Sequence, residues 1–182
     1  MSVFSAIFFP GLSLIALGAA LLSGNPLVAH ALKAMPRSKA AAALFWGAGA
    51  LWFLHIVWTM SPADLVVFQT PGPWAAIYAA LAVAAFYCLP DFLAVRGLCV
   101  LALLAAWQIL AGLFGEYGAT LFVKALVYLA IVLAIYLGCV PYRARDFIQW
   151  LLTRPGRARA LGAAMLACGL LCAGIAFFHR GA

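Results

Sequence analysis

Charged residues are scarce in this sequence of 182 residues. Asp, Glu, Lys and Arg together make up 8% of it, while hydrophobic residues make up 69% and the mean hydropathy is +1.15. Soluble domains carry roughly 25% charged residues, because a surface that faces water needs polar groups. The composition therefore excludes a soluble globular domain and indicates a protein that lies within a lipid bilayer.

Catalytic groups and catalytic motifs are equally scarce. The sequence has only four Asp and Glu residues and three His residues, which leaves little material for acid–base chemistry or magnesium binding. It contains no His-Glu-x-x-His motif, no phosphate-binding Walker loop, no dinucleotide fingerprint and no serine or cysteine nucleophile motif. The sequence therefore favours a role without catalysis.

The five cysteines form no redox or metal motif. All of them lie in or beside apolar runs, where a free thiol behaves as a small hydrophobic group: Cys88, Cys99, Cys139, Cys168 and Cys172. Cys168 and Cys172 share one helical face, but no other Cys or His on that helix could complete a metal site. We expect these side chains to pack, and we predict neither a metal ion nor a cofactor.

Six long apolar runs fill most of the chain. They cover residues 3–24, 40–60, 73–89, 93–114, 119–139 and 160–178. A helix needs about 20 apolar residues to cross ~30 Å of hydrocarbon, and each run has this length or nearly so, the third being the shortest. The sequence predicts an all-α fold, a polytopic membrane bundle of about six transmembrane helices, in which residues 1–182 form a single integral membrane domain.

The basic residues gather in alternate connections between these runs. Cytoplasmic loops carry an excess of Lys and Arg, so the pattern predicts three out-in-out hairpins with both termini outside a bacterial-type inner membrane. The first run follows no basic segment of the signal-peptide kind, and we expect it to be retained as a span. The net charge of +7 is then a sign of orientation, and no nucleic-acid partner is expected. Nine basic residues define the cytoplasmic side: Lys33, Arg37, Lys39, Arg96, Arg143, Arg145, Arg154, Arg157 and Arg159.

Two of the basic connections contain a short amphipathic stretch. Leu27, Val28 and Leu32 fall on one helical stripe in the first, and Phe147 and Leu151 do so in the second. Such helices lie in the plane of the membrane interface, with their basic residues toward anionic lipid headgroups. The sequence therefore predicts two short cytoplasmic interfacial helices and names the bilayer and its anionic lipids as partners.

Small residues recur at four-residue spacing in three of the apolar runs. This spacing lets two helices approach closely in a membrane, so we expect a tight bundle, with a second copy or another membrane protein as a further partner. The residues concerned are Ala43 and Gly47, then Ala76, Ala80 and Ala84, then Ala163 and Ala167.

A few polar side chains fall at a similar depth near the outer side. His55 and Gln108 lie in the outer third of their spans, Lys124 follows about one turn below the start of its span, and Glu116 precedes it. These four residues are candidates for a ligand pocket, in which Lys124 would pair with Glu116 or an anionic ligand and His55 would offer an imidazole. In the alternative, Lys124 extends to the headgroups and Gln108 bonds to a neighbouring helix.

A second group of charged residues lies on the cytoplasmic side: Asp91, Arg96, Arg143, Arg145 and Asp146. These acid and base groups either bridge neighbouring loops or bind a phosphate or lipid headgroup.

Three functional hypotheses remain open. The first is a multi-pass scaffold or subunit without enzymatic activity, whose basic cytoplasmic face meets anionic lipids. The second is a small transporter or channel with an outward-facing polar pocket. The third is a membrane enzyme acting on a lipid or quinone, which requires Asp91, Arg96, Arg143 and Asp146 to meet in one cleft.

Overall fold

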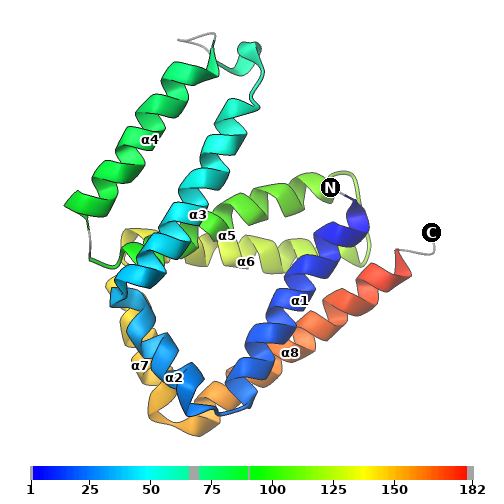
Figure 1. Ribbon diagram of the computed structural model, residues 1–182. Coiled ribbons are helices and arrows are strands. Elements are labelled where there is room, and N and C mark those ends of the chain that lie inside the picture. The colour runs from blue at the N-terminus through cyan, green and yellow to red at the C-terminus, as the bar shows by residue number, and fades with distance from the viewer. Residues whose placement is uncertain (1, 66–69, 90, 180–182) are drawn as a thin grey trace.

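The computed structural model describes residues 2–65, 70–89 and 91–179, and these residues form helices and connections without a strand. Six of the helices are long and apolar enough to cross a membrane. They correspond to the six predicted runs, with small shifts at their ends (Figure 1). Their bounds are α1 Val3–Leu22, α3 Lys39–Trp58, α4 Pro71–Cys88, α5 Leu93–Gly112, α6 Thr120–Cys139 and α8 Pro155–Phe178.

Shorter helices occupy the connections. The two predicted amphipathic stretches form α2, Pro26–Ala34, and α7, Tyr142–Thr153, and each joins two long helices. The single turns η1, Met35–Arg37, and η2, Pro62–Asp64, follow α2 and α3. The sequence therefore located both short helices correctly, whereas their place in the membrane interface stays a prediction.

Local capping explains where several of these helices begin. The Asn25 side chain accepts a hydrogen bond from the Leu27 amide at 2.9 Å, and Pro26 fills the first position of α2. Both features satisfy or remove amides that have no partner within the helix. Ser38 caps α3 in the same way through the Ala41 amide, at 3.2 Å.

The most extensive packing among the described helices joins α1 to α8, which lie side by side in Figure 1. Gly11 faces Gly169, and Gly18 faces Gly162, seven residues along each helix. A methyl group added at Gly169 would lie 2.7 Å from the Gly11 carbonyl oxygen, which is too close for any side chain. The paired glycines therefore let the two backbones touch.

A second glycine contact joins α3 to α5. A methyl group at Gly97 would lie 2.4 Å from the Trp46 amide nitrogen, so α5 meets the backbone of α3 directly. The small residues that the sequence singled out do not make such contacts. Nothing lies within 4 Å of a methyl group added at Gly47, and the remaining predicted positions are half-buried or exposed within this chain: Ala43, Ala76, Ala80, Ala84, Ala163 and Ala167.

The helices pack in pairs that differ from the predicted hairpins. Helix α1 packs on α8, α4 packs on α3, and α6 packs on α5, whereas the helices joined through basic connections make little contact with one another. The reason is visible in Figure 1, where α2 and α7 lie along the lower left and hold apart the long helices that they join. We call this end of the molecule the basic end.

Two of the groups of buried residues in the described part of the chain join three or more helices. At the end opposite the basic end, Ile7 of α1 packs with Leu113, with Val127 of α6 and with Cys172 of α8. At the basic end, Val95 and Cys99 of α5 pack with Ala134 of α6 and Ala144 of α7. The helix pairs α1–α8 and α5–α6 therefore share a core only at the opposite end.

The outer surface of the bundle is strongly apolar. Large side chains such as Leu51, Leu81 and Val132 are mostly exposed, while glycine, alanine and cysteine fill many of the helix contacts. Exposed apolar surface on this scale is unfavourable in water, but it suits contact with lipid chains. Together with the six apolar helices, this surface indicates a multi-pass membrane protein.

Candidate functional site

The basic end carries the nine basic residues that the sequence assigned to one side. Lys33 lies in α2, Arg143 and Arg145 lie in α7, and Arg96 lies in the first turn of α5. Arg154, Arg157 and Arg159 lie just before or within the first turns of α8, and Arg37 and Lys39 link η1 to α3. The fold therefore brings these charges to the same ends of the long helices.

A cleft of about 590 Å³ opens at this end between α5, α6 and α7. Its volume lies within the range of roughly 300–1,000 Å³ that is typical of ligand pockets. The sides come from apolar residues of α5 and α6, and α7 contributes both apolar and polar groups. The lining comprises Met35, Val95, Leu98, Cys99, Leu133, Tyr136, Leu137, Arg143, Ala144, Asp146, Phe147, Ile148 and Trp150.

The charged residues at this cleft differ in their partners. Arg145 holds Asp146 in an ion pair, with its Nη2 and Nε atoms 2.7 and 2.9 Å from the same carboxylate oxygen. Arg143 instead lies over the Tyr142 ring, 5.7 Å from the ring centre. Within the described part of the chain, Arg143 has no carboxylate at ion-pair distance, so its charge stays available to an anion at the cleft.

Arg157 ties the cleft to the start of α8. Its Nη1 atom donates a hydrogen bond to the Trp150 carbonyl oxygen at 3.1 Å, and its guanidinium lies 4.4 Å from the centre of the Trp150 ring. Trp150 is in the last turn of α7, where carbonyl groups have no partner within the helix. Arg157 therefore caps α7 and fixes the position of a cleft residue.

The predicted cytoplasmic group is only partly brought together. Arg143 and Asp146 line the cleft and Arg145 pairs with Asp146, but Asp91 and Arg96 do not line it. Asp91 is exposed. Its near neighbour Phe92 has a positive φ of 58°, and the Phe92 ring lies 5.6 Å from the Arg37 guanidinium, so it links two basic connections.

The predicted outer pocket is also only partly assembled. The Lys124 ammonium donates a hydrogen bond to the Glu116 carbonyl oxygen at 2.5 Å and lies 5.5 Å from the centre of the Tyr117 ring. Lys124 therefore contacts Glu116 through the Glu116 backbone carbonyl, and a pairing of the two charged groups in a ligand pocket stays a prediction.

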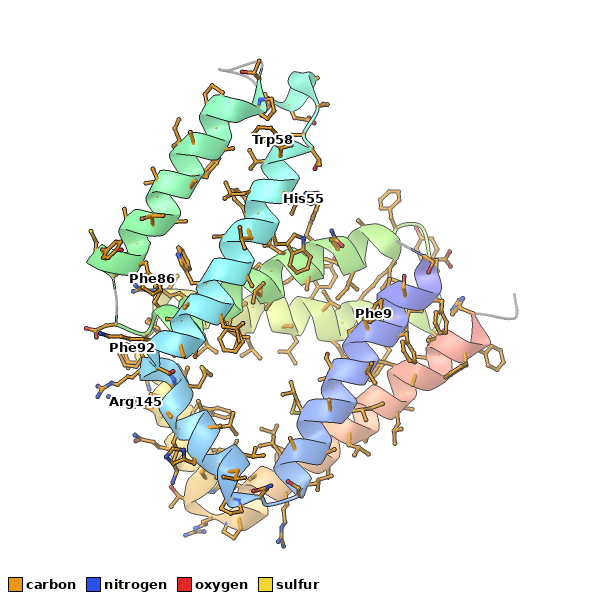
Figure 2. The ribbon with its side chains drawn as sticks, in the orientation of Figure 1. Phe9, His55, Trp58, Phe86, Phe92 and Arg145 are labelled. Atoms are coloured by element: carbon orange, nitrogen blue, oxygen red, sulfur yellow. The ribbon has the colours of Figure 1, made fainter. Side chains whose placement is uncertain are left out.

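His55 and Gln108 lie on two other helices. His55 is in the last turn of α3 with an exposed side chain, and Gln108 is half-buried on α5. Figure 2 shows His55 and Trp58 together toward one end of α3, far from Phe92 and Arg145 at the basic end. Whether these residues line a shared aqueous pocket with Lys124 stays a prediction.

No group of three or more His, Cys, Asp or Glu side chains that could hold a metal ion occurs among the described residues.

Sequence reasoning missed most of the cleft. Tyr136, Cys99 and Leu133 fall within predicted spans, and only the packing of α5, α6 and α7 brings them to one opening. Trp150 could be recognised from the sequence, since an aromatic residue on an amphipathic basic helix marks the headgroup level.

Comparisons with protein families, curated proteins and solved structures found no match for this chain.

Proposed function

We propose that this chain is a multi-pass scaffold or subunit of a bacterial-type inner membrane, without enzymatic activity. Its long helices cross the bilayer with both termini outside, and its basic end lies at the cytoplasmic surface in contact with anionic lipids. The observation that carries this proposal is the gathering of nine of the eleven basic residues at one end of the six apolar helices.

Charge asymmetry of this kind supports the orientation. Lys and Arg are enriched in cytoplasmic loops of membrane proteins, and the cytoplasmic leaflet attracts basic segments by about 1 kcal/mol for each Lys or Arg near its surface. Within the described residues, the opposite end carries Lys124, whose ammonium already bonds to Glu116. The basic end is therefore the end that an anionic surface would attract.

Aromatic residues mark both ends of the helices. Tyr142, Phe147 and Trp150 are exposed on α7, and Phe114 and Tyr117 are exposed at the opposite end. Aromatic side chains favour the two headgroup regions of a bilayer. In the proposed orientation, α2 and α7 lie at the inner headgroup level as interfacial helices.

A role as a subunit would also explain why helix faces made of small residues are exposed. Helix α4 has no buried residue and, among the described residues, packs mainly on α3, so most of its surface is open. We assign this surface and the exposed alanines of α8 to contacts with a second copy or another membrane protein.

The orientation is tested by labelling single cysteines in a variant that lacks the five native ones. Ser61→Cys lies in the connection between α3 and α4, and Gln149→Cys lies on α7; both positions are exposed. A membrane-impermeant thiol reagent added to intact cells should label Ser61→Cys and should reach Gln149→Cys only after the membrane is opened. The reverse labelling would overturn the orientation.

A further inference from the structure

The cleft between α5, α6 and α7 combines an apolar lining with a cation, Arg143, that has no ion-pair partner among the described residues. The groove between α3 and α4, about 390 Å³, is lined by apolar residues and offers no charged group. The hollow between α1, α2, α7 and α8 also places a cation, Arg159, beside apolar residues, but at about 180 Å³ it lies below the roughly 300–1,000 Å³ of typical ligand pockets. Of these three cavities, the first therefore has both the volume and the two-part character that an amphiphilic ligand requires.

The apolar part of the cleft suits a hydrocarbon chain. Leu98 of α5 and Leu133 of α6 line it and are largely exposed to the lipid region. Cys99 and Ala144 are buried beside it and belong to the core that holds α5, α6 and α7 together. A hydrocarbon chain that enters sideways from the bilayer would therefore lie along α5 and α6. It would exchange its contacts with neighbouring lipids for contacts with the protein.

The polar part of the cleft suits an anion. Asp146 is neutralised by Arg145, so the carboxylate does not repel a negative group. Arg143 lines the same cleft with no carboxylate partner among the residues that the structure describes. A guanidinium presents several donors in one plane and matches the oxygens of a phosphate.

We propose that this cleft binds one anionic phospholipid of the cytoplasmic leaflet, with an acyl chain against Leu98 and Leu133 and its phosphate on Arg143. Trp150, held by Arg157, lies at the headgroup level beside it. This inference rests on the proposed orientation, since the cleft faces the inner leaflet only if the basic end is cytoplasmic. It adds a specific site to a general attraction between a basic surface and an anionic membrane.

A quinone is the other amphiphile that such an apolar cleft could accept. Its head is uncharged, so binding of a quinone would not depend on the charge of Arg143. An anionic phospholipid depends on both parts of the cleft, and variants of each part separate the two ligands.

Two variants remove one part of the cleft each, and each has a matched control. Arg143→Gln removes the unpaired cation, and Arg154→Gln makes the same change at an exposed residue outside the cleft. Leu133→Trp fills the cleft from its lipid-exposed side, and Leu129→Trp makes the same change one turn away, at an exposed position that does not line it. Circular dichroism and gel filtration check that all four variants fold.

The measurement is native mass spectrometry of the purified full chain, titrated with phosphatidylglycerol or with phosphatidylcholine of the same acyl chains. The wild type and both controls should bind one phosphatidylglycerol about fivefold more tightly than phosphatidylcholine, because Arg143 attracts the net negative charge of phosphatidylglycerol by about 1 kcal/mol, whereas the choline of phosphatidylcholine neutralises its phosphate. Arg143→Gln should lose this preference, and Leu133→Trp should lose binding of both lipids at this site.

Two results would overturn the inference. If Arg143→Gln and Leu133→Trp keep the wild-type preference, the anionic lipid binds elsewhere on the basic end, and the proposed function stands without this site. If ubiquinone displaces phosphatidylglycerol from the wild type and binds Arg143→Gln equally well, the cleft is a site for an uncharged amphiphile. The labelling of Ser61→Cys and Gln149→Cys tests the orientation independently of either result.

Discussion

Arg157 lies 4.4 Å from the centre of the Trp150 ring and donates a hydrogen bond to the Trp150 carbonyl oxygen. This contact joins the last turn of α7 to the first turn of α8 across a sharp bend in the chain. It uses one basic residue to cap a helix whose final carbonyl groups would otherwise need water or lipid headgroups as partners. The basic end is therefore held together by some of the charges that distinguish it.

Replacing Arg157 with alanine should loosen α7. The variant loses a cation–π contact of about 0.5–1 kcal/mol and the hydrogen bond to Trp150. We expect faster amide hydrogen exchange in residues 147–153, with exchange in α1 little changed. Arg157→Lys keeps the charge but lacks the planar guanidinium, so its exchange rates in residues 147–153 should lie between those of the wild type and Arg157→Ala. Wild-type exchange rates in Arg157→Ala would show that the contact does not hold α7.

Replacing Gly169 with alanine should weaken the contact between α1 and α8. The added methyl group would lie 2.7 Å from the Gly11 carbonyl oxygen and 2.9 Å from the Ile15 amide nitrogen, so two backbones must separate. Overpacking of this kind costs about 1–3 kcal/mol. Thermal unfolding in mild detergent measures this loss of stability. Gly174→Ala on the same helix is the control, because nothing lies within 4 Å of its added methyl group.

Replacing Trp46 with phenylalanine should release α4. The Trp46 indole donates a hydrogen bond to the Ala82 carbonyl oxygen at 2.9 Å, and α4 packs mainly on α3 within the described part of the chain. Interhelical hydrogen bonds in membranes contribute about 0.6 kcal/mol on average, so global stability should change little while exchange in residues 78–86 rises. Trp107→Phe, at an exposed position on α5, should leave α4 unaffected. Equal exchange in both variants would contradict this account.

The helices themselves could be predicted because each depends on a local run of apolar residues. The six long apolar helices and the two short amphipathic helices lie where hydropathy and helical periodicity predict them, while their placement in a membrane stays a prediction. Only the ends shifted, as in α8, which begins at Pro155 because proline suits the first turn of a helix.

The packing could not be predicted because it depends on which faces meet. Alanines at 163 and 167 and glycines at 162 and 169 lie on different faces of one helix, and their spacing alone does not say which face finds a partner. In the structure the glycines form the contact, because Gly11 and Gly18 have the same seven-residue spacing on α1. The cleft was missed for the same reason, since its lining depends on which faces of α5, α6 and α7 meet.

The predicted outer pocket belongs to a different functional hypothesis, in which the chain is a small transporter or channel. If the chain is a transporter, single cysteines at His55, Gln108 and Lys124 should all react with an impermeant thiol reagent added from outside. We expect protection at Gln108 and Lys124, because both positions are half-buried. Labelling at all three positions would favour a water-filled pocket over a packed scaffold.

The attraction between the basic end and anionic lipid is tested most directly by thermal unfolding of the full chain in two kinds of vesicle, phosphatidylglycerol-rich and pure phosphatidylcholine. Each Lys or Arg near an anionic surface contributes about 1 kcal/mol, and salt screens this term. The account predicts a higher Tm in the anionic vesicles, a smaller difference at high salt, and a reduced difference in Lys33→Gln/Lys39→Gln/Arg159→Gln. A charge-preserving control, Lys33→Arg/Lys39→Arg/Arg159→Lys, should behave as the wild type. Equal Tm values in both vesicles at low salt would contradict the account.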